Sequence, residues 1–517
     1  MGLSSVILLA GLACAAPPQR GDVIGEWRFD TEAAQQAWSK AAYASFQPGR
    51  EGRLALCVNV PAGEATGGHM VALKVDLSKY AGCRVFGECL VKAEGVTPPA
   101  ESWNGVKVML HYRSPALGDR WINQGNVHGT FDWKALRFTD TLPADVGVAD
   151  LNLGLQSSAG KVWFDQLRLT VLAPPRPPRP KPADNPPPAY KGHNLPRLRG
   201  VMSPNVFRDE DLRVLGEEWR ANLIRWQLCR NWGRAGTDRD LVEYARWIDA
   251  KLDELDKVLA ACLRYGLKVV IDVHSPPGGR TAEMDLAIGH EPLYQDAFVA
   301  LWERIARRFK GHAALWGYDL VNEPQQNTPP LGVPDFLGIQ VRAAKAIRAI
   351  DPVTPIIIEA DQWDSAAAFA NLDPVDVPNV VYQVHMYVPG EFTHQGVHNS
   401  KTGISYPGKI NGVEWDKERL RKVLAPVREF QLAYNVHIYA GEFSAIRWAP
   451  GDSAYRYLRD CIDLFEEYGW DWSYHAYREW DGWSVEHGSD PKDNKPTKQP
   501  TDRKKLLLEW FGRNQRP

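Results

Sequence analysis

Residues 196–515 alternate between two patterns of apolar residues. Short runs that are apolar almost throughout predict strands, and segments with apolar residues at helical spacing predict helices. The predicted strands span residues 198–202, 222–228, 267–273, 315–321, 355–360, 379–386, 437–441 and 470–474. The predicted helices include residues 252–263, 298–309, 341–350 and 455–468. Eight apolar strands that alternate with helices over about 320 residues favour a (β/α)8 TIM barrel, whose parallel strands are buried on both faces.

Residues 22–172 show a different pattern, in which short alternating segments are separated by Gly, Pro, Asn and Asp. The segments that alternate most clearly are residues 54–60, 106–112, 136–138, 151–155 and 162–169. This pattern predicts antiparallel strands. About 150 residues suffice for an all-β jelly-roll or sandwich domain. The chain is therefore predicted to be an α/β protein, with an all-β domain before the barrel.

Proline dominates the predicted linker between the two domains, residues 173–195. Nine of the fifteen residues from 174 to 188 are Pro. Such a run favours the extended polyproline II conformation and spans roughly 45 Å. The linker either spaces two modules that act on one extended target or tethers them without a further role.

An apolar run from Leu3 to Ala16 opens the chain and is too short to span a bilayer. Ala13 and Ala15 form the Ala-x-Ala pattern that is typical of signal-peptide cleavage. Residues 1–16 are therefore predicted to be a signal peptide, and the protein is expected to be secreted, either extracellular or periplasmic. No later segment predicts a transmembrane helix, so we expect no membrane insertion.

The composition excludes some classes of function. Lys and Arg number 61 against 63 Asp and Glu, a net charge of −2, which argues against a nucleic-acid partner. Trp is unusually frequent, with 20 residues against 16 Phe, which favours stacking surfaces in addition to core packing. The cysteines lack the spacing of a zinc site, and so large a core does not need disulfides.

Polar residues end five of the predicted barrel strands. They are Arg225, His274, the pair Asn322 and Glu323, the pair His385 and Tyr387, and Glu442. The chemistry of a TIM barrel lies at the C-terminal ends of its strands. If the barrel closes, these side chains converge on one rim, which a set of unrelated loop residues would not do.

Two carboxylates on opposite walls of a cleft are what cleavage of a glycosidic bond requires. One gives a proton to the leaving oxygen, and the other attacks the anomeric carbon or activates water. Glu323 and Glu442 follow the fourth and seventh predicted strands, so we expect them to face each other. A separation of about 5–5.5 Å would indicate retention of configuration, and about 6.5–9.5 Å inversion.

The segments Val321-Asn322-Glu323-Pro324 and Gly441-Glu442-Phe443-Ser444, with the other strand-end residues, resemble glycoside hydrolase family 5, the cellulase family. The resemblance covers about residues 196–515. It implies a retaining double displacement without a cofactor, with Glu323 as acid/base and Glu442 as nucleophile. The other implied roles are Asn322 at the sugar 2-OH, Arg225 and Tyr387 beside the nucleophile, and His274 and His385 along the subsite before the cleaved bond.

The sequence departs from this family after the eighth strand, where a Trp usually forms a sugar platform. His475 aligns with that position. Trp480, a few residues later, and Trp363, after the fifth strand, are alternative platforms. For each Trp, a place in the core is an equally open interpretation.

The first domain resembles carbohydrate-binding β-sandwich domains through residues 26–30, 132–134 and 162–165. Trp103, Tyr112 and Trp121 are candidates for stacking on sugar rings. Some relatives bind a structural calcium through acidic residues of the first and last strands, which makes Asp165 a weak candidate ligand. The alternative is a sandwich that only packs on the barrel.

These features predict a polysaccharide as partner and a monomeric enzyme, with no cofactor. The first hypothesis is a secreted endo-β-1,4-glucanase (a cellulase), with a β-mannanase or another hemicellulase as the alternative enzyme. A catalytically inactive polysaccharide-binding protein is the alternative from another class. Every expected catalytic position is filled, which favours the enzyme.

Overall fold

The computed structural model describes residues 16–101, 103–123, 127–182, 195–327, 332–397 and 400–515. Apart from Ala16, the predicted signal peptide lies outside these residues. The chain divides into two compact units, Met1–Pro178 and Arg179–Pro517, so the division falls within the proline-rich segment. No helix in the described ranges combines the length and apolar character that crossing a membrane requires.

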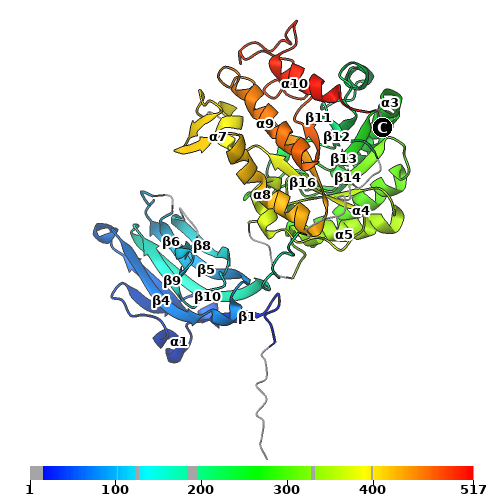
Figure 1. Ribbon diagram of the computed structural model, residues 1–517. Helices are drawn as coiled ribbons and strands as arrows, with labels where there is room; N and C mark the ends of the chain where they lie inside the picture. Colours follow the sequence, from blue (N-terminus) through cyan, green and yellow to red (C-terminus); the bar gives the residue numbers. More distant parts are fainter. Residues whose placement is uncertain are drawn as a thin grey trace, which may run out of the picture. The chain divides into compact units, whose positions relative to one another are not determined.

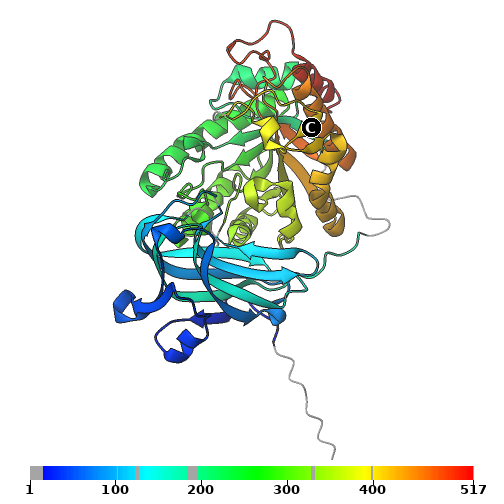
Figure 2. The ribbon, with the colours of Figure 1, turned by 90° about the vertical axis from the view of Figure 1, so that its left-hand side faces the viewer.

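The first unit consists of two antiparallel sheets that enclose one apolar core, as the alternating pattern predicts. Its strands are β1 (Val23–Trp27), β2 (Ala44–Pro48), β3 (Leu54–Val60), β4 (Gly68–Asp76), β5 (Arg84–Val96), β6 (Gly105–Ser114), β7 (Gly118–Ile122), β8 (Gly129–Thr141), β9 (Val148–Gln156) and β10 (Gly160–Ala173), with a short helix α1 (Glu32–Gln36) after β1. One sheet has the order β2-β3-β10-β5-β8, with β1 paired to β10, and the other the order β4-β9-β6-β7. Figure 2 shows these strands in blue and cyan.

The three aromatic residues proposed for sugar stacking lie in different surroundings. Tyr112 is buried in the core, and its hydroxyl donates to Asp140 Oδ2 at 2.5 Å. Tyr112 therefore offers no ring face to a ligand, and that expectation was wrong. Trp103 and Trp121 are 61% and 55% exposed, and Trp121 stacks on His111 with ring centroids 3.5 Å apart.

Asp165, the candidate calcium ligand, is fully buried on β10, and its Oδ1 accepts a hydrogen bond from the backbone N–H of Gln166 at 2.7 Å. Burial raises the pKa of its carboxyl. Within the described residues, the clusters of three or more potential metal ligands lie in the second unit and do not include Asp165. The assignment of Asp165 as a calcium ligand therefore stays a prediction.

The second unit is a closed parallel barrel, which confirms the predicted fold (Figure 1). Its strands in barrel order are β11 (Arg199–Met202), β12 (Leu223–Gln227), β13 (Lys268–Asp272), β14 (Leu315–Asp319), β15 (Ile356–Glu359), β16 (Val380–Met386), β19 (His437–Phe443) and β20 (Asp471–Tyr474). Each of the eight predicted strands is present, with ends within two residues of the prediction.

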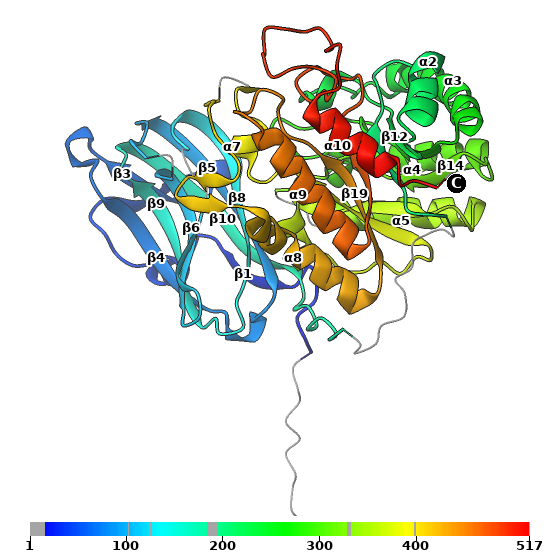
Figure 3. The ribbon, with the colours of Figure 1, turned by 45° about the horizontal axis from the view of Figure 1, so that its top comes forward.

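Helices cover the outside of the barrel. They are α2 (Asp209–Arg213), α3 (Leu241–Tyr265), α4 (Pro292–Phe309), α5 (Phe336–Ile350), α8 (Lys417–Tyr434), α9 (Ser453–Tyr468) and α10 (Asp502–Phe511). Two shorter helices, α6 (Asp361–Asp364) and α7 (Gly390–Thr393), lie instead in the segments that follow the C-terminal ends of β15 and β16. The helices α8, α9 and α10 lie next to one another (Figure 3). A short hairpin of β17 (Gly408–Ile410) and β18 (Val413–Trp415) precedes α8.

The boundaries of α3 show how the sequence sets a helix. The Asp240 carboxylate accepts hydrogen bonds from the backbone N–H groups of Val242 and Glu243, which the first turn leaves without helical partners. The helix ends at Gly266, which adopts a left-handed φ of 71° that a residue without Cβ tolerates best. The apolar stripe between these ends is buried against the barrel, as predicted.

A small apolar cluster fills the barrel interior and is separate from the larger core that includes the helices. Its buried members are Leu198, Leu223, Val270, Trp316, Ile357, Val381 and Tyr439. Interiors packed at this density relax only partly when a side chain is shortened. The support beneath the strand ends therefore depends on these side chains.

Replacing Ile357, which is fully buried in this cluster, by Ala is expected to lower the free energy of unfolding of the barrel by about 2–5 kcal/mol. The change leaves a cavity that the surrounding strands cannot close. Urea unfolding followed by Trp fluorescence measures the loss. The control is Leu293→Ala on α4, at a side chain that is 61% exposed, which should change the same quantity by no more than about 0.5 kcal/mol. Equal losses in the two variants would contradict the expectation.

Candidate active site

A cavity of about 880 Å³ opens at the C-terminal ends of the barrel strands. It brings together residues that lie far apart along the chain. The predicted residues that line it are His274, Asn322, Glu323, Trp363, His385, Tyr387, Glu442, His475 and Trp480. Arg225, the remaining predicted residue, lies fully buried and contacts Glu442. The structure therefore collects the predicted barrel residues at one place.

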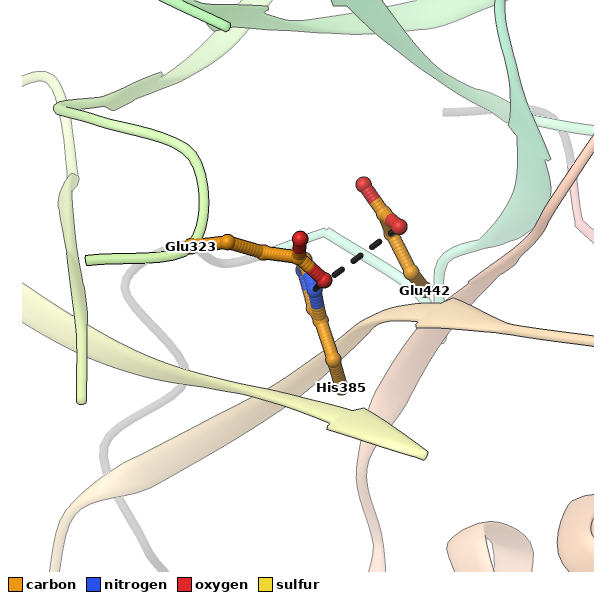
Figure 4. Close-up of side chains that lie close together, drawn as sticks. All are labelled: Glu323, His385 and Glu442. Carbon is orange, nitrogen blue, oxygen red and sulfur yellow. Dashed lines mark hydrogen bonds and ion pairs between the residues drawn. The ribbon is translucent and has the colours of Figure 1, made fainter. Parts of the chain in front are cut away.

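Glu323 and Glu442 face each other across this cavity (Figure 4). One carboxylate oxygen of each lies within 4.8 Å of the other. His385, on β16, lies between them: its Nδ1 is 2.9 Å from Glu323 Oε1 and 3.7 Å from Glu442 Oε2. The two carboxylates thus come from β19 and from the residues that follow β14, and one imidazole contacts both.

Arg225 orients Glu442 from below. Its Nη1 donates to Glu442 Oε1 at 2.5 Å, its Nε donates to Asp319 Oδ2 at 2.7 Å, and its Nη2 donates to Glu359 Oε1 at 2.9 Å. The side chain is completely buried, so these carboxylates replace the water that the guanidinium loses. Because the planar fork has fixed directions, the Glu442 carboxylate is held in one orientation.

The electrostatic surroundings keep Glu442 ionised. Burial acts to raise the pKa of its carboxyl, but the nearby His385, His475 and Arg225 outweigh burial and hold the pKa well below its usual range. Opposite charges within hydrogen-bond distance favour the charged form of a carboxyl group. Glu442 therefore has the charge that a nucleophilic carboxylate requires at neutral pH.

His475 stands after the eighth strand, at the position where the family resemblance predicts a Trp that stacks on a sugar ring. Its Nδ1 lies 2.5 Å from Tyr387 Oη and 3.2 Å from Glu442 Oε2, and its Nε2 lies 2.9 Å from Glu479 Oε2. Tyr387 in turn donates to Glu442 Oε2 at 2.8 Å. Burial opposes protonation, but Glu479 and Glu442 raise the pKa of His475 to about 10. The residue is therefore a cation beside Glu442.

Asn322 and His274 are linked to each other and to the buried acids. His274 Nδ1 lies 2.8 Å from Asp272 Oδ2, and its Nε2 lies 3.2 Å from the amide nitrogen of Asn322. The amide oxygen of Asn322 accepts a hydrogen bond from Arg225 Nη2 at 3.1 Å. These bonds fix which end of the Asn322 amide faces His274 and which faces Arg225.

The sequence analysis missed Glu359, which ends β15 and positions Glu323. Its Oε2 accepts a hydrogen bond from the backbone N–H of Glu323 at 2.6 Å. Glu323 has a left-handed φ of 49°, a conformation that costs energy for a residue with a side chain and persists where the surroundings impose it. Burial, together with Asp319 and Asp364, raises the pKa of Glu359 well above its usual range. The feature of the sequence that could have identified Glu359 is its position as an acidic residue at the end of an apolar run.

Aromatic side chains form much of the remaining lining. Trp363 is 39% exposed, and the Arg280 guanidinium lies 4.4 Å from its ring centroid. Trp480 is 38% exposed and Trp232 is 58% exposed, whereas Trp483 is buried. Both proposed platforms therefore reach the cavity, and Trp232 and Trp483 were missed because each lies in a loop without a regular pattern.

The long loop after β16 also contributes to the lining. His394 and Val397 border the cavity, and the His394 ring packs edge-on against the Trp483 ring. The first part of this loop is a wall of the cavity.

Two groups of side chains in the described residues are close enough to hold a metal ion. One is Glu323, His385 and Glu442, and the other is Glu359, Asp364 and His385. Both groups include His385, whose Nδ1 is already within hydrogen-bond distance of Glu323. The facing carboxylates, one of them held ionised, are sufficient for acid–base and nucleophilic chemistry without a metal.

A closed (β/α)8 barrel whose cavity holds two facing carboxylates defines a glycoside hydrolase. The family model described as cellulase (glycosyl hydrolase family 5) matches residues 188–479, and the chain belongs to this family.

Individual proteins are similar to part of the chain. Endoglucanase C of Acetivibrio thermocellus is 30% identical over 255 residues, a match that covers 43% of this chain and 72% of that protein. Cellodextrinase A of Ruminococcus flavefaciens is 26% identical over 274 residues, with 51% and 76% covered. Among solved structures, Thermotoga maritima Cel5A in complex with cellobiose is 24% identical, with 60% of this chain and 97% of that chain covered and a TM-score of 0.47.

Replacing His475 by Gln removes one of the cations that hold the pKa of Glu442 low. The acidic limb of the pH profile of kcat/KM should therefore move to higher pH, because Glu442 then takes up a proton at a higher pH. Initial rates on a soluble oligosaccharide between pH 3 and pH 9 measure the shift.

The matched control is His487→Gln, a change of the same kind outside the cavity lining. It should leave the acidic limb where it is. An acidic limb that stays in place in His475→Gln, or one that moves to lower pH, would show that His475 does not act on Glu442 in this way.

Proposed function

We propose that this protein is an endo-β-1,4-glucanase that cleaves its substrate with retention of configuration. The observation that supports retention is the close approach of the two carboxylates: one oxygen of each lies within 4.8 Å of the other, and His385 Nδ1 lies 2.9 Å from Glu323 and 3.7 Å from Glu442. Retaining enzymes place these groups about 5–5.5 Å apart, whereas inverting enzymes leave about 6.5–9.5 Å for a water molecule.

In the first step, an ionised oxygen of Glu442 attacks the anomeric carbon. The bond between that carbon and the leaving oxygen breaks, and Glu323 transfers its proton to that oxygen. In the second step, Glu323 takes a proton from water, the water oxygen attacks the anomeric carbon, and the ester bond to Glu442 breaks. The sugar keeps its configuration because it is displaced twice.

The surrounding residues divide between the two carboxylates. Arg225, Tyr387 and His475 hold Glu442 oriented and charged until it reacts. His385 contacts Glu323 directly, at 2.9 Å. Asn322, whose amide is fixed by Arg225 and His274, is placed to hydrogen-bond the sugar 2-OH beside Glu442.

The proposed substrate rests on the relatives and on the aromatic lining. Endoglucanases are among the similar proteins, and Trp232, Trp363 and Trp480 present partly exposed rings along the cavity. Aromatic faces pack well against the apolar faces of pyranose rings. Several platforms along one cavity suit the interior of a long chain better than a single terminal residue.

We further propose that residues 1–16 direct secretion and that the first unit binds polysaccharide. Secretion follows from the Ala-x-Ala pattern and from a substrate too large to enter a cell. A carbohydrate-binding unit would keep the barrel close to an extended substrate, since linking two binding modules raises the effective concentration of the second. Every proposed catalytic residue comes from one chain, which suits a monomer.

Replacing either glutamate by Ala should produce a distinct kinetic pattern. Glu323→Ala should lower kcat/KM on cellotetraose by about 10²–10⁴-fold, and kcat/KM on a 2,4-dinitrophenyl β-cellobioside much less, because the leaving group of that substrate needs no proton. Glu442→Ala should abolish turnover of both substrates, because both need the nucleophile. Steady-state rates on the two substrates separate the roles.

The control for these variants is Glu414→Ala, an exposed glutamate on β18 outside the cavity lining. It should react with both substrates at the rate of the unaltered protein. If Glu442→Ala kept substantial activity on the aryl glycoside, the assignment of the nucleophile would be wrong.

The stereochemistry and the substrate are tested on the unaltered protein. Proton NMR during the first minutes of cellotetraose hydrolysis should show the β-anomer of the new reducing end before mutarotation. On a panel of β-glucan, β-mannan and xylan, β-1,4-glucan should give the highest kcat/KM. An initial α-anomer would refute retention, and faster cleavage of mannan or xylan would replace the proposed substrate.

A further inference from the structure

Arg280, in the segment that follows β13, is a buried cation to which the proposed mechanism gives no role. The side chain is 5% exposed. The acceptors that the described residues offer to its guanidinium are backbone carbonyl groups, whereas the equally buried Arg225 is surrounded by carboxylates. Burying a charge without an opposite charge in contact costs free energy. Proteins accept such a cost mainly at functional sites, so the position of Arg280 calls for an explanation beyond packing.

The guanidinium of Arg280 is bound to the backbone of Glu323. Its Nη2 donates to the Glu323 carbonyl at 2.9 Å and to the Asn322 carbonyl at 3.4 Å. Glu359 Oε2 accepts the backbone N–H of Glu323 at 2.6 Å, so both polar groups of the Glu323 backbone are held by buried side chains. The left-handed φ of 49° at Glu323 persists only where the surroundings impose it. Arg280 and Glu359 together impose it, and so they set the direction in which the Glu323 side chain leaves the chain.

Arg280 is itself fixed by neighbouring segments of the second unit. Its carbonyl accepts the N–H of Gly236 at 2.9 Å, and its backbone forms isolated β-bridges with Ala235 and Leu286. Its Nη1 donates to the carbonyl of Met284 at 3.1 Å. These contacts place the guanidinium independently of its bond to Glu323. A group that orients another side chain must be held in this way before the substrate binds.

The other contact of Arg280 is with Trp363. The guanidinium lies 4.4 Å from the Trp363 ring centroid, within the range of a cation–π interaction. Trp363 lines the catalytic cavity, and its backbone N–H donates to the carbonyl of Pro324, directly after Glu323, at 3.1 Å. Arg280 itself is not among the described residues that line this cavity. It can therefore act on a bound substrate only through its neighbours.

We propose that Arg280 is a positioning residue for Glu323, which holds the backbone of Glu323 in the conformation that directs its carboxyl group at the leaving oxygen. The inference rests on the proposed role of Glu323 as acid/base. A guanidinium suits this task because its planar fork donates to the carbonyls of Met284 and Glu323 in fixed directions, which the single ammonium of a Lys cannot do. A displacement of about 1 Å in a catalytic group can cost about 10²-fold in rate.

The test compares two substrates in the full-length Arg280→Lys protein. On cellotetraose, whose leaving group needs a proton, kcat/KM should fall by about 10- to 100-fold. On 2,4-dinitrophenyl β-cellobioside, whose leaving group needs none, kcat/KM should fall by less than about 3-fold. The ratio of the two values in one preparation does not depend on the fraction of folded protein, so a destabilised variant still gives a result. Arg280→Gln, which removes the charge, should change this ratio in the same direction.

A double-mutant cycle determines whether Arg280 acts through Glu323. In the Glu323→Ala protein, adding Arg280→Lys should lower kcat/KM on cellotetraose by no more than about 2-fold, because the side chain that Arg280 positions is absent. The matched control is Arg239→Lys. The Arg239 guanidinium also lies over an aromatic ring, that of Tyr294 at 5.0 Å, but it pairs with Glu291 outside the cavity lining. This variant should hydrolyse both substrates at the rate of the unaltered protein.

Equal losses on the two substrates in Arg280→Lys, or no loss on either, would overturn the inference. So would a 10- to 100-fold loss that persists when Arg280→Lys is added to Glu323→Ala. The proposed function fails in a different way: Glu323→Ala would then lower kcat/KM equally on both substrates, and the inference would fail with it. If Glu323→Ala spares the aryl glycoside and Arg280→Lys does not, the inference alone is wrong.

Discussion

The burial of Arg225 among carboxylates is the interaction on which the catalytic site depends. A guanidinium removed from water is stable only where hydrogen bonds to acceptors replace its hydration. Here the acceptors come from the ends of β14, β15 and β19, so one side chain on β12 fixes the relative positions of four strand ends. The geometry of Glu442 follows from this arrangement, and its carboxylate is thereby part of what neutralises the buried cation.

The same arrangement gives the two glutamates different surroundings. Cations lie around Glu442: Arg225 on one side and His475 on the other, with the pKa of His475 raised to about 10. Glu323 contacts a single imidazole, and its backbone is held by Glu359 and by Arg280 Nη2, which donates to the Glu323 carbonyl at 2.9 Å. Two residues of one type can therefore perform different steps, because the charges around them differ.

Much of the barrel fold and of the candidate active site could be predicted from the sequence, for a definite physical reason. Parallel strands buried on both faces appear as uninterrupted apolar runs, so a polar residue that ends such a run, as Glu442 does, stands out. The buried supports gave a weaker signal. Asp319 and Glu359 also end their strands, but an acid at the end of an apolar run gives no indication of whether its partner is a substrate or a buried cation. Packing was beyond prediction as well: the placement of Trp483 in its loop and the burial of Tyr112 on β6 depend on contacts that spacing along a chain does not encode.

The loop after β15 connects the lining of the cavity to the buried acids that lie beneath Glu323. Gln362, Trp363 and Asp364 have left-handed φ values of 57°, 62° and 52°, an unfavourable conformation for three successive residues with side chains. The conformation places Trp363 at the cavity, while the buried Asp364 Oδ1 accepts the N–H of Ala360 at 2.7 Å. Asp364 lies near Glu359 and helps to raise the pKa of Glu359, and burial raises the pKa of Asp364 itself well above its usual range. A change at Trp363 therefore acts on the same loop that supports the acids beneath Glu323.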